Sequence, residues 1–221
     1  MKAVKAVLAV VIGFVLMASV GFAVEPKYSG FLEGYYQDLQ PGPEGGVNMR
    51  WLKPGVMFGK YNKIMVDSVI FFFADDSQYK GIDPNEMKEL SDGFNQAIVA
   101  ALKDKSPIVT EPGPDVARLR IAITGVKQSK PVASAFSSLI PIGLAVSVVK
   151  KGASGSWSGS GATSAEFELL DSVTNDVIIV AVDKRTAGFT ERFSKWGSAQ
   201  EAFKFWAERI VAFIDSTRGM K

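Results

Sequence analysis

The side chains best suited to ligand binding lie near the N-terminus, in a segment rich in aromatic residues, glycine and proline. Tyr35 and Tyr36 precede Arg50 and Trp51, and turn-forming residues separate the two pairs. A guanidinium group can hold a carboxylate or phosphate through two parallel hydrogen bonds, and aromatic rings commonly line small-molecule pockets. These four residues are therefore a candidate ligand cleft. The alternative, which we favour, is that the aromatic rings only anchor an irregular arm.

Histidine and cysteine are both absent from the sequence. Their absence removes Ser-His-Asp and Cys-His sites, disulfides, and the common imidazole and thiolate metal sites from consideration. Asp75 and Asp76 are adjacent, so in a strand their side chains would point to opposite faces. The run 155–159, Gly-Ser-Trp-Ser-Gly, has tryptophan where a nucleophile elbow has serine. We therefore predict no catalytic residue, no metal site and no cofactor.

A second candidate surface lies in the stretch 127–161, where the pattern of regular elements is interrupted. Residues 131–149 are uncharged, and residues 152–161 are rich in glycine and serine. In one interpretation this apolar run contacts a membrane or a partner protein. In the other, which we favour, it folds back over the sheet, because soluble proteins rarely expose large apolar patches. The apolar side chains concerned are Phe136, Leu139, Ile140, Ile142 and Leu144.

The first 23 residues have the three parts of a signal peptide. Lys2 and Lys5 supply positive charge, an apolar run follows, and Gly21-Phe22-Ala23 has small residues at the two positions that signal peptidase reads. We expect cleavage after Ala23, secretion across the inner membrane, and a periplasmic or outer-membrane-associated location. The alternative is an uncleaved anchor, because the run approaches the roughly 18 residues at which a membrane-spanning helix becomes possible.

The charge balance indicates which partners to expect. The formal net charge is +2, but Lys2 and Lys5 lie in the segment that we expect to be removed, which contains no acidic residue. A nearly neutral domain has no bulk field that attracts phosphates, so we predict no nucleic-acid partner. We expect instead an envelope protein as partner, with peripheral membrane contact through residues 131–149 as a further hypothesis.

Several segments have the residue pattern of β-strands. The segment 61–73 is dense in β-branched and aromatic residues, so we predict a strand that is buried on both faces and bulged near Asp67. The segment 116–126 alternates apolar and polar side chains, which predicts one face in contact with water. The segments 165–170 and 177–183 predict a hairpin, and Asn175 helps its loop because asparagine tolerates a left-handed conformation.

Two further segments have the pattern of amphipathic helices. The first begins at Asp83-Pro84, because aspartate caps helix N-termini and proline fits the first turn, and its apolar stripe continues to Leu102. The second begins at Ser198, with Glu201 three residues later as in a capping box. The elements together predict an α+β fold, in which both helices pack on one face of a mainly antiparallel sheet.

The domain organisation follows from these elements. We predict a signal peptide at residues 1–23, an irregular arm at 24–56, and a single α+β domain at 57–221 with an insertion at about 127–161. Because 47% of the residues are hydrophobic and 22% are charged, the mature chain can bury a core of its own.

Motifs along the mature chain are shared with a known family. They are Tyr28-Ser29-Gly30-Phe31-Leu32, Arg50-Trp51, Glu166-x-Glu168-Leu169-x-Asp171-Ser172, Val182-Asp183-x-Arg185 and Phe203-x-x-Trp206-Ala207. Through them the chain resembles the bacterial lipoprotein family called domain of unknown function 3313. The resemblance implies an envelope location and implies no enzyme activity. The sequence departs from the family pattern in having no lipobox cysteine and in having Asn175 where glycine is usual.

These observations lead to two main functional hypotheses. The first is a non-catalytic accessory protein of the cell envelope that binds another envelope component through the arm or through residues 131–149. The second is a periplasmic protein that binds a small molecule or lipid between the arm and the sheet. A hydrolase that uses carboxylates is disfavoured, because the sequence has no paired-acid signature.

Overall fold

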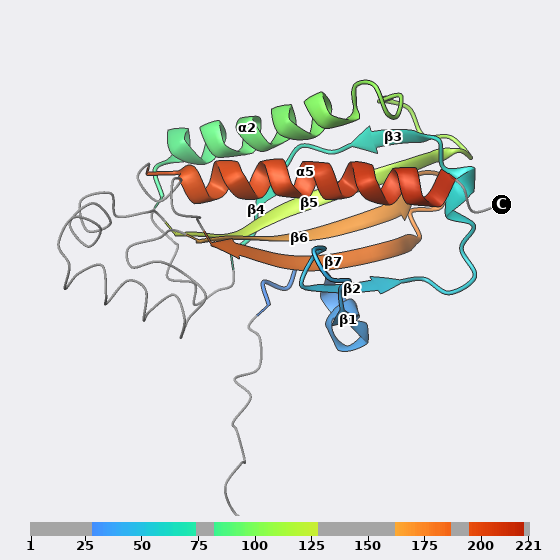
Figure 1. The fold of residues 1–221 in the computed structure, drawn as a ribbon, viewed down its shortest axis with the longest axis horizontal. Coiled ribbons are helices and arrows are strands. Elements are labelled where there is room, and N and C mark those ends of the chain that lie inside the picture. The colour runs from blue at the N-terminus through green and yellow to red at the C-terminus, as the bar shows by residue number, and fades with distance from the viewer. Residues whose placement is uncertain (1–27, 74–81, 128–161, 187–194, 219–221) are drawn as a thin grey trace, which may run out of the picture.

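A computed structural model describes residues 28–73, 82–127, 162–186 and 195–218 (Figure 1). Its sheet has seven strands in the order β1-β2-β7-β6-β5-β3, and β4 also pairs with β5. The strands are β1 (Gln40–Pro41), β2 (Met49–Leu52), β3 (Lys63–Val66), β4 (Ile70–Phe71), β5 (Val116–Lys127), β6 (Ala162–Asp171) and β7 (Val177–Thr186). β3 and β4 run parallel to β5, whereas the other neighbours are antiparallel.

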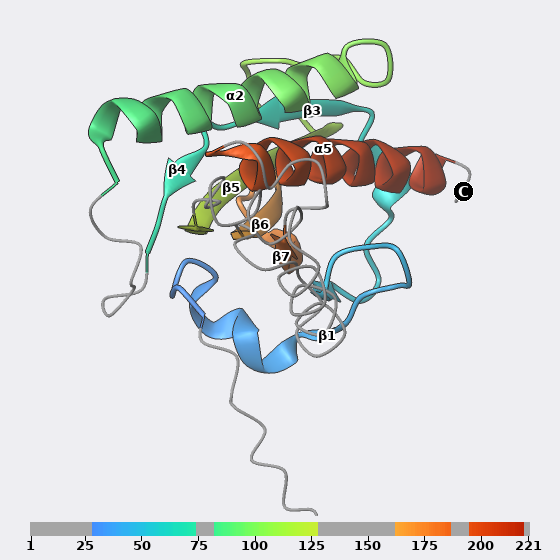
Figure 2. The ribbon, with the colours of Figure 1, turned by 60° about the vertical axis from the view of Figure 1, so that its left-hand side comes forward.

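Two helices, α2 (Pro84–Leu102) and α5 (Gly197–Arg218), lie side by side on one face of this sheet (Figures 1 and 2). The prediction of an α+β fold with two helices on one face of a mainly antiparallel sheet is therefore confirmed. The short 3-10 helix η1 (Glu33–Asp38) lies on the opposite face (Figure 2). The irregular arm was predicted at residues 24–56, and its described part, 28–56, supplies η1 and strands β1 and β2.

The region 61–73 forms two short strands where the sequence predicts one. Between them, the guanidinium group of Arg118 on β5 holds the Asp67 carboxylate through hydrogen bonds of 2.9 Å to each oxygen. Asp67 lies where the sequence predicted a bulge. At this residue the chain leaves its pairing with β5, and it resumes that pairing at Ile70. Burial on both faces is contradicted, because Ile70 is 43% exposed.

Helix α2 begins as its sequence predicts. The Asp83 carboxylate accepts a hydrogen bond of 2.8 Å from the backbone N–H of Asn85, and Pro84 occupies the first turn. Helix α5 begins one residue before the predicted cap, Ser198. The Ser198 hydroxyl is buried without a hydrogen-bond partner among the described residues, so the prediction that it caps the helix is wrong.

An aromatic cluster joins both helices to the sheet. The rings of Phe94 on α2 and Phe203 on α5 are stacked with centroids 4.5 Å apart. Trp206 on α5 packs edge to face against Phe167 on β6 at 5.5 Å. Aromatic pairs in these arrangements contribute more than their buried area alone, so this cluster fixes the first half of α5 against the sheet.

The arm covers the other face of the sheet. Leu32 is fully buried there and packs with Ala122 of β5 and Val180 of β7. The face of β5 that was predicted to contact water is therefore largely covered, because the alternating pattern cannot show what packs upon it. Asn175 has a φ of 59°, which confirms the left-handed conformation predicted for the hairpin loop.

Some predicted features lie outside the described residues. They are the signal peptide at 1–23 and the apolar segment 131–149 with Phe136, Leu139, Ile140, Ile142 and Leu144. Among the helices of the described ranges, none combines the length and the apolar character needed to span a bilayer.

Candidate functional site

The structure divides the four residues of the predicted cleft between two faces of the sheet. Trp51 points toward the arm, where its ring centroid is 5.1 Å from that of Tyr35. Tyr36 packs in the same cluster. Arg50 precedes Trp51 on β2 and lines a cavity on the helix-covered face. Because successive side chains of a strand point to opposite faces, Arg50 is separated from the three aromatic residues.

Tyr36 fastens the arm to the sheet. Its hydroxyl donates a hydrogen bond of 2.7 Å to the buried Glu166 carboxylate, which also accepts from the Ser29 hydroxyl at 2.8 Å and the Ser29 amide at 3.0 Å. The ring of Tyr36 stacks on Tyr28 with centroids 4.5 Å apart. Burial raises the pKa of Tyr36 to about 12. Tyr36 therefore remains a neutral donor, and its role is to hold the arm.

Glu168, two residues after Glu166 on β6, is a second buried carboxylate. Glu168 accepts a hydrogen bond of 2.6 Å from Arg120 of β5. Burial raises the pKa of Glu168, although the positive charge of Arg120 opposes this shift. The guanidinium of Arg120 also lies 5.2 Å from the ring centroid of Phe31 in the arm. This ion pair therefore also contributes to the contact between the sheet and the arm.

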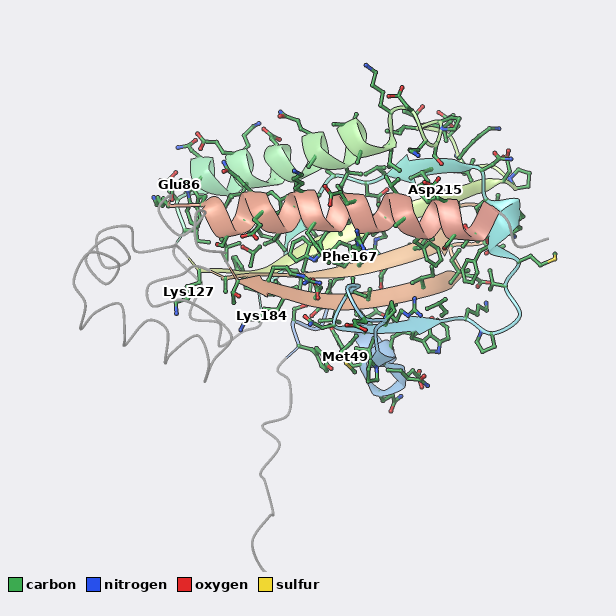
Figure 3. All side chains as sticks on the ribbon, viewed as in Figure 1. Met49, Glu86, Lys127, Phe167, Lys184 and Asp215 are labelled. Atoms are coloured by element: carbon green, nitrogen blue, oxygen red, sulfur yellow. The ribbon has the colours of Figure 1, made fainter. Side chains whose placement is uncertain are left out.

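The cavity lies between the sheet and α5 and has a volume of about 330 Å³. Its floor includes a row of cross-strand neighbours on β2, β7, β6 and β5, namely Leu52, Ile179, Leu169 and Leu119. In the adjacent row, Arg50 pairs with Ala181, and Ala181 pairs with Phe167. Figure 3 shows Phe167 beneath α5, with Asp215 marking the C-terminal part of the helix.

The roof of the cavity comes mainly from the second half of α5. Ile210, Phe213 and Ile214 line it and recur with the spacing of one helical face. Phe58 of the 3-10 helix η2 (Phe58–Lys60) closes against Phe213 with ring centroids 5.6 Å apart. The small side chains of Ala117 and Ala181 leave space on the floor. The cavity is thus a mainly apolar space under the helix.

A few polar groups interrupt this apolar lining. They are Glu44, Arg50, Tyr61, Ser106, Arg209, Ser216 and Thr217. Arg209 of α5 is exposed, and its guanidinium lies 3.4 Å from the Gly45 carbonyl oxygen. Among the residues that the structure describes, no three acidic side chains gather closely enough to hold a metal ion. The lining therefore suits an apolar ligand with a polar end.

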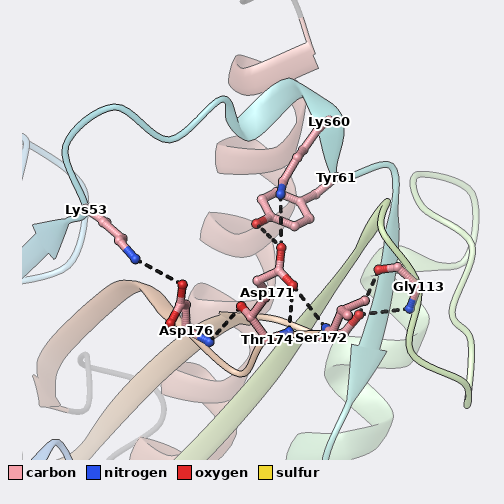
Figure 4. Close-up of polar contacts among 9 residues, drawn as sticks. Lys53, Lys60, Tyr61, Gly113, Asp171, Ser172, Thr174 and Asp176 are labelled. Carbon is pink, nitrogen blue, oxygen red and sulfur yellow. Dashed lines mark hydrogen bonds and ion pairs between the residues drawn. The ribbon is translucent and has the colours of Figure 1, made fainter.

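A polar network orients the η2 end of the cavity (Figure 4). Asp171, at the end of β6, accepts hydrogen bonds from Tyr61 at 2.9 Å and Lys60 at 3.0 Å. The backbone amides of Val173 and Thr174 donate to its other oxygen. Burial opposes ionisation of Asp171, but these hydrogen bonds outweigh it and lower the pKa of the carboxyl below its ordinary value. An ionised Asp171 thus holds Tyr61 at the cavity wall.

A second network holds α5 to the sheet beside the cavity. The fully buried Asp183 of β7 accepts hydrogen bonds from the Trp206 indole at 2.6 Å and from the backbone N–H of Asn48 at 2.7 Å. Arg185 donates to the same carboxylate at 2.5 Å, and its guanidinium lies 3.5 Å from the Phe205 ring centroid. This network joins β7, α5 and the turn before β2, which are three walls of the cavity.

Sequence reasoning missed most of the cavity residues. The spacing of Ile210, Phe213 and Ile214 predicts a helix face that packs in the core. A helix that covers a cavity has the same spacing, so the pattern does not distinguish the two cases. The buried Asp183 network could have been suspected, because Asp183 and Trp206 both belong to motifs that the family resemblance includes. The alternation of β2 also indicates that Arg50 and Trp51 point apart.

Comparison with known proteins identifies relatives. The model of a family described as "Protein of unknown function (DUF3313)" matches residues 27–210. A curated relative, "Uncharacterized lipoprotein YdcL" of Escherichia coli (strain K12), is 28% identical over 158 residues, which cover 71% of this chain and 69% of the relative.

Solved structures with a similar chain path are also known. The PelC dodecamer from Paraburkholderia phytofirmans in space group P6 has a TM-score of 0.41 at 13% identity, and the match covers 72% of this chain and 96% of that chain. Protein XCC0632 from Xanthomonas campestris has a TM-score of 0.39 at 13% identity, with 70% and 84% covered.

Proposed function

This chain belongs to the DUF3313 family of proteins of unknown function, and on that premise we propose that it is a non-catalytic protein of the bacterial cell envelope whose cavity binds a small apolar or amphipathic molecule. The envelope component bound would then be a lipid or lipid-like molecule. The observation that carries the proposal is the apolar cavity of about 330 Å³ beneath α5.

An envelope location is supported by a curated relative and by the N-terminal sequence. The Escherichia coli relative is named a lipoprotein, and lipoproteins are proteins of the cell envelope. The N-terminal segment of this chain has a signal-peptide pattern, which favours export across the inner membrane. Both points agree with a protein that meets lipids outside the cytoplasm.

The size and lining of the cavity support a small apolar ligand. Its volume is at the lower end of the roughly 300–1,000 Å³ found for small-molecule sites. An apolar ligand in this space would remove the apolar lining from water and add van der Waals contacts to it. Leu169, Ile179 and Ile210 line the cavity and are only half-buried, which makes their apolar surface available to a ligand.

The polar chemistry of the described residues supports binding over catalysis. The sequence contains no histidine or cysteine. Each of the buried carboxylates Glu166, Glu168, Asp171 and Asp183 already has hydrogen-bond donors that hold structural elements together. Of the described residues that line the cavity, Glu44 alone carries a carboxylate, which leaves no acid pair for hydrolysis.

This proposal develops the second of the two sequence-based hypotheses and moves its site. The ligand was expected between the arm and the sheet, whereas the cavity lies on the opposite face, under α5. A protein partner that binds through residues 131–149 stays a prediction, because that segment lies outside the described residues.

Native mass spectrometry tests the proposal directly. The protein would be purified without detergent, incubated with a lipid extract of the bacterial envelope, and examined for bound mass. We expect discrete adducts on the wild type, clearly weaker adducts on Ala181→Leu, which narrows the cavity beside Arg50, and unchanged adducts on Tyr35→Phe, which alters the opposite face. Absence of adducts on the wild type, or equally strong adducts on Ala181→Leu, would contradict the proposal.

A further inference from the structure

The chemistry around Arg50 indicates what kind of amphipathic molecule the cavity binds. We infer that the ligand is an anionic single-chain amphiphile, and that Arg50 binds its carboxylate or phosphate while the chain extends under α5. This inference rests on the proposed function, because it assigns the two ends of the ligand within the same cavity.

The guanidinium group of Arg50 differs from those of its neighbours in having no partner among the described residues. Three other arginines of the sheet each pair with an acid: Arg118 with Asp67, Arg120 with Glu168 and Arg185 with Asp183. Within the described part of the chain, the Arg50 side chain makes neither a hydrogen bond nor an ion pair, although the residue is half-buried against the cavity. A guanidinium beside apolar surface loses hydration, and an anion with two oxygens would compensate for that loss.

The other charges near the cavity agree with an anionic ligand. Arg209 of α5 adds a second positive charge and is exposed at the cavity wall. Glu44 is the opposing charge, but it lies on an exposed turn and forms no ion pair with the described residues. The charges that line the cavity therefore favour an anion at the β2 side.

The floor of the cavity sets the direction of the chain. Arg50 and Leu52 lie on β2, and from Leu52 the apolar row crosses β7 and β6 to Leu119 on β5. Neighbouring strands are about 4.8 Å apart, so the row spans roughly 14 Å. A ligand along this row has its anionic group at Arg50 and the end of its chain near Leu119. The length of this row and the cavity volume of about 330 Å³ fit one acyl chain of medium length.

Arg50 is placed to act on the ligand without supporting the fold. Its backbone lies in the β2–β7 ladder, which any side chain can maintain, and its guanidinium holds no described residue. Arg50→Gln should therefore fold like the wild type and lose only the anion contact. Arg50→Lys retains the positive charge but cannot form two parallel hydrogen bonds to the anion. This variant therefore distinguishes the effect of the charge from the effect of the guanidinium geometry.

Isothermal titration calorimetry on the mature protein tests this inference with three probes of equal chain length. Dodecanoate presents a carboxylate, dodecyl phosphate presents a phosphate, and monododecanoyl glycerol is uncharged. We expect the wild type to bind the preferred anion about tenfold more tightly than the neutral probe. Arg50→Gln should reduce the affinity for that anion to the neutral level and leave the neutral probe unchanged, with Arg50→Lys between the two.

The outcomes separate this inference from the proposed function. Tighter binding of dodecanoate indicates a fatty acid, and tighter binding of dodecyl phosphate indicates a phospholipid-derived ligand. If all three probes bind equally to the wild type and to Arg50→Gln, the role of Arg50 is refuted while the cavity remains a binding site. If none of the three binds, both the inference and the proposed function are overturned. Circular dichroism of each variant verifies the fold.

Discussion

Arg50 of β2 lies opposite Ala181 of β7 in the antiparallel ladder, and both residues line the cavity beneath α5. The small side chain leaves room beside the cation, which a larger residue at position 181 would occupy. The next pair of the same ladder, Trp51 and Val180, belongs to the cluster that holds the arm. Two adjacent residues of β2 thus lie on different faces of the sheet: Arg50 faces the candidate binding site, and Trp51 packs against the arm.

Enlarging Ala181 should narrow the cavity at little cost to stability. Ala181→Leu adds apolar atoms to empty space, so we expect its free energy of unfolding to stay within about 1 kcal/mol of the wild type. Ala165 is fully buried on the same face and does not line the cavity. Ala165→Leu should therefore overpack the core and destabilise the protein by about 1–3 kcal/mol. Urea unfolding measures both, and equal losses would contradict the assignment of the cavity.

The hydroxyl of Tyr36 should contribute to stability, and that of Tyr35 should not. Tyr36→Phe removes a donor from the buried Glu166 carboxylate, and hydrogen bonds to charged groups contribute about 1.5–3 kcal/mol. The Tyr35 hydroxyl forms no hydrogen bond with the described residues, so Tyr35→Phe is a matched control. Chemical denaturation of the two variants makes the comparison. If both variants unfold at the same urea concentration, the Tyr36 hydroxyl does not fasten the arm to the sheet.

Asp171 should make stability depend on pH in the acidic range. Its folded-state pKa lies below the ordinary value of about 3.9, so its contribution is fully present above about pH 4 and is lost progressively as the pH falls from there toward the lower folded-state pKa. Asp171→Asn should be less stable by about 2 kcal/mol at pH 7. Unfolding curves from pH 7 to pH 3 should show this difference shrinking. A constant difference would mean that the charge of Asp171 has no role.

The hairpin loop should tolerate glycine at position 175 better than alanine. Asn175 has a φ of 59°, which costs residues other than glycine and asparagine about 1–2 kcal/mol. We expect Asn175→Ala to lower the melting temperature and Asn175→Gly to leave it nearly unchanged. If the two variants melt together, backbone strain is not what selects the residue.

The sequence predicts the elements well because their signals are local. Asp83 and Pro84 mark the start of α2, and the alternation of residues 165–170 and 177–183 marks the hairpin. The pairing of β3 and β4 with β5 is not local, and neither is the covering of the β5 face by Leu32. Such contacts depend on tertiary packing, which a single segment does not encode.

The candidate site was less predictable for the same reason. Ile210 and Phe213 have the spacing of a core stripe, and only the packing of α5 over the small residue Ala181 converts part of that stripe into a cavity roof. Arg50 was recognised as a ligand-binding type of residue, but it was grouped with Tyr35 and Trp51. These aromatic residues lie on the other face of the sheet.

The central claim is that an apolar chain binds between α5 and the sheet, and methyl NMR tests it most directly. Leu169 and Ile179 line the cavity, whereas their neighbours Leu170 and Ile178 do not, so each pair contains its own control. On titration with dodecanoate, the account predicts that the methyl signals of Leu169, Ile179 and Ile210 shift and saturate together, while those of Leu170 and Ile178 stay in place. Unchanged signals at Leu169 and Ile179 under saturating dodecanoate would contradict it.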